Sequence, residues 1–330
     1  MISNKNQITL NPLILISFFQ MVETEFTVEI NGNTLAGTVC IPYKAKTCPM
    51  VLLIHGSGPL DRDANLRGFK LNVFNIIAHD LVKIGIGSLR YDKRGCGKSA
   101  GDYNSTGHLD LVEDALGLVS YLKQQEYCDH KHIYLLGYSE GTIIAPQVSI
   151  RDRSIAGLLL LCPFTQKIEV LLEQQAKQIS KEIQNLKGIK GLLMKPLVRL
   201  FGNPVTLQEN LIAKVKKSST STIKFRLKTI NALWLREIFN VDAKSIYPQV
   251  NCPMLVIGGE KDIQCPPEDV GEIQKLSKQN VETHIIPNMT HILRSDKNEA
   301  SFFNYKHLIK QEMEVEVMQL CQEWLQKQLS

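Results

Sequence analysis

The apolar residues in the predicted strands of this chain follow two patterns, an alternating one and a continuous one. From Glu25 onward they alternate with polar residues on either side of Asn31-Gly32-Asn33, a pattern that predicts a β-hairpin closed by a turn with positive φ. Residues 50–54 are instead continuously apolar, which is typical of a strand buried on both faces of a parallel sheet. Similar runs predict further strands at 84–91, 132–137, 155–162, 254–258 and 281–286.

Helical periods separate most of these runs. They predict helices over residues 69–83, 109–123 and 140–150. The order strand, loop, helix, strand is repeated with short connections, which indicates an open α/β sheet with helices on both faces.

The stretch between the strands predicted at 155–162 and 254–258 is too long for a simple crossover. Apolar residues step by three and four from Ile168 to Leu186, which predicts an amphipathic helix. We expect two glycines to break this helix and two prolines to interrupt the residues after it; these are Gly188, Gly191, Pro196 and Pro204. This part of the chain therefore predicts a separate helical unit.

These patterns divide the chain into three parts. Residues 21–165 and 246–330 are predicted to form the α/β core, and residues 166–245 a helical cap inserted into it. Residues 1–20 are expected to be a loosely attached extension, or the true start lies at Met21. The apolar run at 13–19 resembles the core of a signal peptide, but it lacks a small-residue cleavage site and is too short to span a bilayer. We therefore expect a cytoplasmic protein without stable membrane insertion, with export as the alternative.

Composition narrows the class of protein further. With 330 residues, 44% hydrophobic and 22% charged, the chain is that of an ordinary globular protein with one large domain. A net charge of +5 is mild and no dense basic run lies among aromatic residues, so we expect no nucleic-acid partner. The eight cysteines are scattered, without a C-x-x-C pair or histidines at ligand spacing, so we expect reduced thiols and no metal site.

The positive charge is concentrated in the predicted cap. Residues 166–245 hold 15 Lys and Arg against 6 Asp and Glu, whereas acidic residues are in excess in the rest of the chain. This charge would suit anionic acyl donors or an anionic membrane surface. It is equally consistent with the solvated faces of helices, which charge runs usually are.

The strongest chemical signal is Gly137-Tyr138-Ser139-Glu140-Gly141, between an apolar strand and a helix pattern. A nucleophile elbow needs this context, because its serine sits on a strained turn above the sheet edge and the flanking glycines let neighbouring chains approach. The alternative is that Ser139 only caps the following helix.

A serine hydroxyl also needs a base, an orienting acid and oxyanion donors. His291 lies on a loop after the last predicted strand, and Asp262 follows the strand before it. Glu260 is the competing acid. The order Ser, Asp, His is the one expected of an α/β-hydrolase.

Donors for an oxyanion are expected from two backbone amides, those of Ser57 and Glu140. Ser57 lies in His55-Gly56-Ser57-Gly58-Pro59, a loop that follows the buried strand at 50–54. His55, Gly56 and Tyr138 are candidates for the substrate mouth. The alternative for the two glycines is a tight strand exit alone.

These motifs together resemble those of the α/β-hydrolase superfamily, and more narrowly of small bacterial serine esterases with a helical cap. The matching stretches are His55–Pro59 with Asp61-Arg62-Asp63, Arg90–Ser99, Gly137–Gly141 with Ala145-Pro146, Gly259–Asp262 and Thr290-His291. The resemblance implies a mostly parallel eight-stranded sheet with an N-terminal antiparallel hairpin, cofactor-free acyl transfer in two steps and carboxylic ester substrates. That family usually has His where this chain has Tyr138, and Gly where it has Thr142, which puts the shape of the acyl pocket in doubt.

The sequence thus favours a carboxylesterase in which Ser139 attacks, His291 transfers the proton and Asp262 orients His291. Thioesterases and serine aminopeptidases share this catalytic triad and are the alternatives. A cap rich in cations is poorly suited to the substrate ammonium of an aminopeptidase. A hydrolase fold used only for ligand binding or interaction is the alternative from another class. The expected partner is a small-molecule ester, with the protein a monomer or homodimer. Asp92 and Arg94 are expected to fix their loop, and Asp61, Arg62 and Asp63 either to shape the substrate mouth or to form an ion-paired loop.

Overall fold

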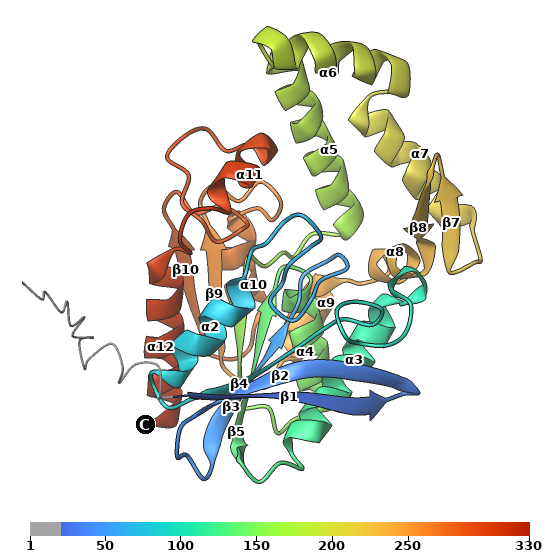
Figure 1. The fold of residues 1–330 in the computed structure, drawn as a ribbon. Helices are drawn as coiled ribbons and strands as arrows, with labels where there is room; N and C mark the ends of the chain where they lie inside the picture. The colour runs from blue at the N-terminus through green and yellow to red at the C-terminus, as the bar shows by residue number, and fades with distance from the viewer. Residues whose placement is uncertain (1–20) are drawn as a thin grey trace, which may run out of the picture.

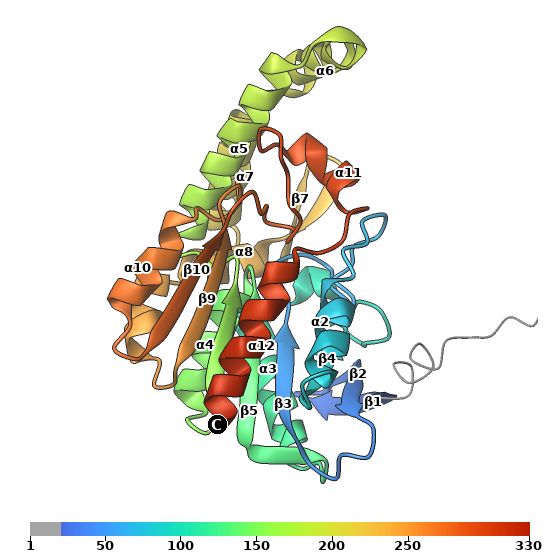
Figure 2. The ribbon, with the colours of Figure 1, turned by 90° about the vertical axis from the view of Figure 1, so that its left-hand side faces the viewer.

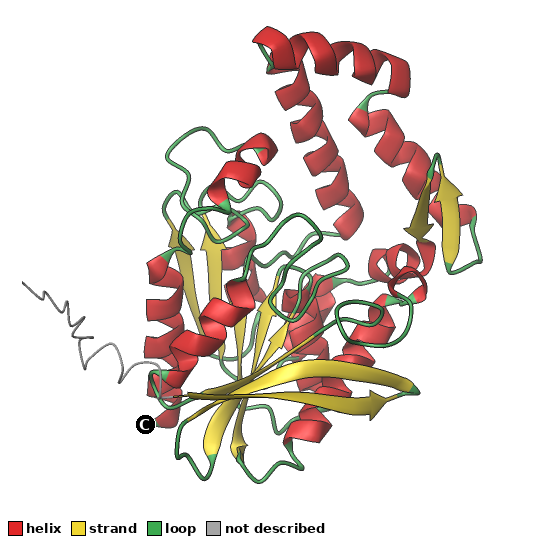
Figure 3. Ribbon diagram, viewed as in Figure 1, coloured by secondary structure: helices red, strands yellow, loops and turns green. Residues whose placement is uncertain are grey.

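A twisted eight-stranded sheet runs through the middle of the protein (Figures 1 and 3). The computed structural model describes residues 21–330, so the expected extension at 1–20 lies outside the described residues. The strand order is β1-β2-β4-β3-β5-β6-β9-β10. The strands are β1 (Met21–Ile30), β2 (Asn33–Pro42), β3 (Cys48–Ile54), β4 (Gly87–Tyr91), β5 (Cys128–Tyr138), β6 (Gly157–Leu161), β9 (Met254–Gly259) and β10 (Val281–Ile286).

The first two strands form the predicted antiparallel hairpin. Asn31 and Gly32 have φ values of 50° and 75°, the left-handed pair that a tight hairpin turn requires. β2 also pairs antiparallel with β4, and every other pairing in the sheet is parallel. The expected mostly parallel eight-stranded sheet is thereby confirmed.

Both faces of the sheet are buried under helices, as the continuous apolar runs predict. In β3, Val51 and Leu53 belong to one hydrophobic cluster and Leu52 and Ile54 to the other. Helices α2 (Val73–Val82) and α12 (Val315–Leu329) cover the first face, and α3 (His108–Leu122), α4 (Gly141–Arg151) and α10 (Glu268–Leu276) cover the second (Figure 2). The remaining short elements of the core are η1 (Tyr103–Ser105), η3 (Phe302–Asn304) and α11 (Tyr305–Leu308).

Two predicted boundaries are wrong at the start of the α2–β4 unit. The helix expected from residue 69 begins at Val73, because Phe69 pairs with Leu66 in an isolated bridge and Asn72 takes a left-handed conformation with φ 54°. The strand expected from residue 84 begins at Gly87, after a turn in which Gly85 has φ 81°.

The segment between β6 and β9 forms a projecting unit above one end of the sheet (Figures 1 and 2). It contains α5 (Ile168–Asn185), α6 (Gly188–Phe201), α7 (Pro204–Lys217), β7 (Thr222–Phe225), β8 (Lys228–Asn231), α8 (Ala232–Phe239), α9 (Ala243–Ile246) and η2 (Tyr247–Gln249). We refer to α5 through α8 as the cap.

Two details of the cap differ from the expectation of an all-helical unit. A hairpin, β7–β8, lies between α7 and α8, and its turn uses Arg226 with φ 54° in place of the glycine or asparagine that signals a hairpin in sequence. Gly188 does separate two helices, but Gly191 and Pro196 lie inside α6. Gly191 serves close packing, since a Cβ there would lie 2.3 Å from the carbonyl oxygen of Leu186.

Apolar side chains of two cap helices are buried in the same hydrophobic cluster as Leu52 and Ile54 of the sheet. They are Ile168 and Leu171 on α5, and Ala232 and Leu235 on α8. Among the helices that the structure describes, none has the length and apolar character needed to cross a bilayer.

The packing of α12 against the sheet yields a prediction about stability. Trp324 is 1% exposed and its ring meets Tyr134 edge-on, with 6.1 Å between ring centroids. Gly157 makes room for the indole, because a Cβ there would lie 2.6 Å from its Cη2 atom. We expect Trp324→Ala to lower the free energy of unfolding by about 3–5 kcal/mol in urea titrations. Gln326→Ala, exposed on the same helix, is the control, and an equal loss in both variants would contradict this account.

Candidate active site

Ser139 lies on a sharp turn where β5 ends and α4 begins. Its φ is 54°, in the left-handed region that a non-glycine residue rarely occupies. Both flanking glycines are required by close contacts. A Cβ on Gly137 would lie 2.2 Å from the carbonyl oxygen of Gly141, and one on Gly141 would lie 2.2 Å from that of Ile54. Residues 137–141 therefore form a strained elbow, in which the chain folds tightly against the end of β3.

The structure brings Ser139, His291 and Asp262 together in one hydrogen-bonded chain. Ser139 Oγ lies 3.0 Å from His291 Nε2, and His291 Nδ1 lies 2.8 Å from Asp262 Oδ2. The three residues follow β5, β10 and β9, whose carboxyl ends meet at one edge of the sheet. His291 and Asp262 are 5% and 6% exposed. In such an arrangement the imidazole can take the hydroxyl proton while the carboxylate fixes its tautomer.

Asp262 and His291 are each held by further contacts. Asp262 Oδ1 accepts hydrogen bonds from the amides of Gln264 and Cys265, both at 2.8 Å. Tyr138, expected at the substrate mouth, lines the pocket and also donates its hydroxyl to the carbonyl of His291 at 2.7 Å. Its ring stacks on the imidazole with 5.5 Å between centroids. Glu260, the competing acid, instead accepts a hydrogen bond from the Asn288 amide.

The loop after β3 lies directly against the elbow. A Cβ added to Gly56 would lie 3.0 Å from Ser139 Cβ, so the glycine allows this approach. Gly56 and Ser57 both line the pocket that contains Ser139. Among the hydrogen bonds of residues 21–330, the N–H groups of Ser57 and Glu140 have no protein acceptor. Two backbone donors are thus available beside the serine hydroxyl, as an oxyanion site requires.

His55 is misplaced by the sequence-based interpretation. It is fully buried behind the loop, where its ring packs against Phe74 and Tyr91, and its Nε2 lies 3.0 Å from the carbonyl oxygen of Asp61. It does not line the pocket. Burial, with a smaller effect of the nearby Lys93, lowers the pKa of His55 to about 3. This histidine is a structural residue of the core and not part of the substrate mouth.

The side chain of Glu140 belongs to a buried polar cluster that sequence reasoning missed. Its Oε1 accepts hydrogen bonds from Trp234 Nε1 at 2.6 Å and His108 Nδ1 at 2.9 Å, and its Oε2 lies 3.8 Å from Lys93 Nζ. Burial favours the neutral acid, but Lys93, His108 and Trp234 outweigh it and lower the pKa of Glu140 to about 2. The only signal in the sequence was the position of Glu140 beside the serine, because its partners lie far along the chain.

The charged residues near the loop are paired with one another. Arg62 donates to Asp92 and Thr38, and Asp63 accepts from Arg90, so these two residues follow the ion-paired alternative. Asp61 instead accepts hydrogen bonds from the amides of Asp63 and Asn65, which fix the turn of the loop. Arg94 is bound by Asp114 at 2.6 Å, in keeping with a role in fixing its loop.

A mostly apolar pocket of about 230 Å³ opens over Ser139, between the core and the cap. Its wall comes from the loops after β3, β6, β9 and β10 and from α5 and α8. The lining residues are Gly56, Ser57, Leu60, Leu66, Phe69, Leu71, Tyr138, Ser139, Phe164, Ile168, Leu171, Leu172, Gln175, Trp234, Gln264, Cys265, His291, Ile292 and Tyr305. Within this described lining there is no aspartate, glutamate, lysine or arginine.

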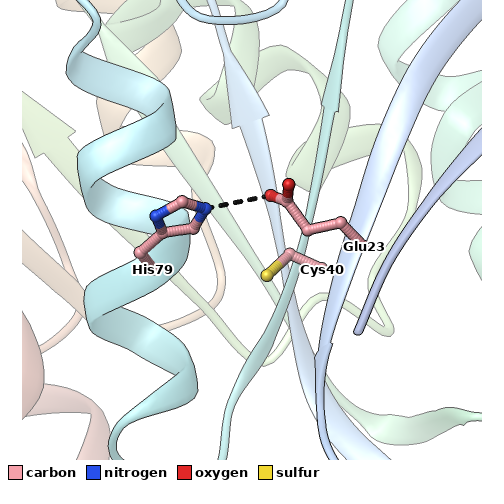
Figure 4. A group of neighbouring side chains, drawn as sticks. All are labelled: Glu23, Cys40 and His79. Atoms are coloured by element: carbon pink, nitrogen blue, oxygen red, sulfur yellow. Dashed lines mark hydrogen bonds and ion pairs between the residues drawn. The ribbon is translucent and has the colours of Figure 1, made fainter. Parts of the chain in front are cut away.

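Two groups of potential metal ligands occur within the described residues. Glu23, Cys40 and His79 meet between β1, β2 and α2 (Figure 4), but the Glu23 carboxylate already binds Arg90 Nη2 at 2.7 Å and His79 at 3.0 Å. Burial raises the pKa of Cys40 to about 12, which disfavours the thiolate that a metal binds. The second group, Cys162, Asp262 and His291, uses the Asp–His pair described above. Neither donor set suits a cation as arranged.

The fold and the site define an α/β-hydrolase. The chain belongs to the serine aminopeptidase S33 family of hydrolases, whose model matches residues 68–298. It is 28% identical over 279 residues to the esterase EstD of Thermotoga maritima, a match that spans 84% of this chain and 62% of EstD. It is 26% identical to the proline iminopeptidase PfmaB of Pestalotiopsis fici, over 82% of this chain and 94% of that protein.

Solved structures confirm the fold. Est1E from Butyrivibrio proteoclasticus, solved with bound ferulic acid, superposes with a TM-score of 0.60 at 18% identity, covering 92% of this chain and 99% of Est1E. DcsB, solved in complex with a substrate analogue, gives a TM-score of 0.62 at 17% identity, covering 94% of this chain and 99% of DcsB.

The buried, neutral His55 predicts a pH dependence of stability. In the unfolded chain this imidazole takes up a proton near its ordinary pKa of 6.5, whereas in the folded protein it stays neutral down to about pH 3. Between these values the unfolded state binds more protons, so the free energy of unfolding falls as the pH falls. We expect His55→Gln, which keeps a donor for the Asp61 carbonyl, to reduce that slope by up to about 1.4 kcal/mol per pH unit.

The measurement is a series of urea titrations from pH 7 to pH 4. His307→Gln, at an exposed position, is the matched control and should keep the slope of the unaltered protein. An unchanged slope in His55→Gln would show that His55 is protonated in the folded state.

Proposed function

We propose that this hydrolase is a serine carboxylesterase that cleaves small to medium acyl esters. The observation that carries the proposal is the Ser139–His291–Asp262 chain at the base of an apolar pocket. EstD supports ester substrates by its name, although the match spans only 62% of its length.

In this proposal the reaction has two acyl-transfer steps. Ser139 Oγ attacks the ester carbonyl carbon while His291 Nε2 takes its proton, and the tetrahedral oxyanion accepts hydrogen bonds from the amides of Ser57 and Glu140. The carbon–oxygen bond to the alcohol then breaks, and His291 returns the proton to the leaving oxygen. Water, deprotonated by the same imidazole, attacks the acyl-serine and releases the acid and the free hydroxyl.

The size and chemistry of the pocket support the substrate class. A volume of about 230 Å³ lies below the range typical of sites for drug-sized ligands, which favours short acyl groups over large ones. Leu171, Leu172 and Phe164 supply an apolar wall for an acyl chain. The lining that the structure describes includes no basic residue of the cap, so the walls around the serine are uncharged.

A serine aminopeptidase is the second candidate, favoured by the family description and by the likeness to PfmaB. Such an enzyme must hold the α-ammonium of its substrate, and a buried cation needs a carboxylate partner. Since no carboxylate occurs in the described lining, the pocket is better matched to a neutral acyl group. Thioesters remain the closest alternative, because they differ only in the leaving group.

Hydrolysis of p-nitrophenyl esters from acetate to laurate tests the proposal. We expect turnover with an optimum at short to medium chains, and we expect Ser139→Ala to reduce kcat by about 10⁴-fold or more, since the nucleophile is lost. Ser149→Ala is the matched control, because Ser149 is a buried serine on α4 that donates its hydroxyl to the Pro146 carbonyl and does not line the pocket. It should retain the activity of the unaltered protein.

A fluorophosphonate probe separates the remaining possibilities. If the probe labels Ser139 but no ester is hydrolysed, the protein is a serine hydrolase whose substrate has a leaving group other than an alcohol. Thioesters and proline anilides would then be assayed next. If neither labelling nor turnover occurs, the protein is not a serine hydrolase and the non-catalytic alternative stands.

A further inference from the structure

Lys93 is a buried cation next to the candidate oxyanion site, and the reaction as described does not use it. It follows β4 and is 1% exposed. Its Nζ donates a hydrogen bond to the carbonyl oxygen of Gly56 at 2.7 Å and lies 3.4 Å from that of Gly58. A fully buried lysine is rare unless it is paired, so its contacts require an explanation.

The Gly56 carbonyl is directly bonded to one of the groups that the proposed reaction needs. It belongs to the same peptide group as the N–H of Ser57, one of the two expected oxyanion donors. The structure has no cis peptide bond among residues 21–330, so the N–H of this planar unit points away from its C=O. A cation fixed on the oxygen therefore orients the N–H on the opposite side. It also withdraws electron density from the amide, which strengthens the N–H as a donor.

The second donor is tied to the same lysine. Glu140, whose own N–H is the second expected oxyanion donor, places its carboxylate 3.8 Å from Lys93 Nζ and so balances the buried charge. Burial lowers the pKa of Lys93, and Glu140 opposes this effect. Lys93 thus joins the loop after β3 to the elbow after β5, the two segments that carry the donors.

We infer that Lys93 is the positioning residue of the oxyanion site, which it builds by orienting and polarising the Gly56–Ser57 peptide. The inference rests on the proposed serine-hydrolase function and adds a residue to its machinery. Lys93 touches no substrate, because it does not line the pocket. Its effect is on the transition state, in which the oxyanion carries charge, more than on the binding of the neutral ester.

The test compares the rate at which an alkyl fluorophosphonate labels Ser139 in the unaltered protein and in Lys93→Met. Labelling forms the Oγ–P bond, expels fluoride and transfers the serine proton to His291, with the phosphoryl oxygen in the oxyanion site. We expect labelling about 10–100-fold slower in Lys93→Met, less than the loss of a whole donor. The inhibition constant of an alkyl trifluoromethyl ketone should rise by a similar factor, with KM for esters nearly unchanged.

Lys214→Met is the matched control. Lys214 also donates to a backbone carbonyl, that of Lys224 at 2.6 Å, but on the exposed side of the cap and away from the pocket. This variant should be labelled at the rate of the unaltered protein. If Lys93→Met does not fold, the double variant Lys93→Met/Glu140→Gln removes both buried charges and is compared in the same way.

The outcomes separate this inference from the function it rests on. Equal labelling rates and equal ketone inhibition in a folded Lys93 variant would overturn the role of Lys93 and leave the hydrolase proposal standing. A parallel rise in KM and loss of melting temperature, without a change in ketone inhibition, would show a purely structural lysine. An unaltered protein that is neither labelled nor active would overturn both proposals.

Discussion

The left-handed turn at Ser139 is the constraint on which the site depends. A residue with a side chain at φ 54° is strained, and it is held there because the chain on both sides of it is packed without room for a Cβ. Gly141 lies against the carbonyl of Ile54, the last residue of β3. The same contact that maintains the strain therefore brings the loop after β3 to the serine. The neighbouring positions of β3 and β5 in the sheet make this possible.

The acid and the base reach the serine by a different route. β9 and β10 are paired in parallel beside β6, so the loops that follow them leave the same edge of the sheet as the elbow. Asp262 and His291 then need only short loops to meet Ser139. The hydroxyl of Tyr138 holds the carbonyl of His291, which links the histidine loop directly to the elbow. Tyr138 thus has a structural reason to be there, besides its place in the pocket wall.

Local pattern was sufficient to predict the strands, the elbow and the order of Ser139, Asp262 and His291, since each follows a strand that is visible in the hydropathy. The predictions that failed and the features that were missed have separate physical causes. His55 has the neighbourhood of a mouth residue in sequence, yet its ring faces the core because Phe74 and Tyr91 enclose it. The cap hairpin escaped notice because Arg226, and no glycine, takes the positive φ of its turn. Lys93 and Trp234 are 47 and 94 positions from Glu140 in sequence, beyond the reach of any local pattern.

The cluster around Glu140 also connects the cap to the chemistry. Trp234 comes from α8, lines the pocket with its ring and donates its N–H to the carboxylate of the residue that follows Ser139. A buried ion pair such as Lys93–Glu140 adds little to stability compared with apolar residues of the same volume, because both charges lose their hydration. The position of this ion pair is better explained by its contacts. Lys93 holds the Gly56–Ser57 peptide, and Glu140 holds Trp234 in the wall of the pocket. A movement of α8 would displace Trp234 and with it the Glu140 carboxylate that Trp234 binds. The position of the cap and the geometry around Ser139 are therefore coupled through this hydrogen bond.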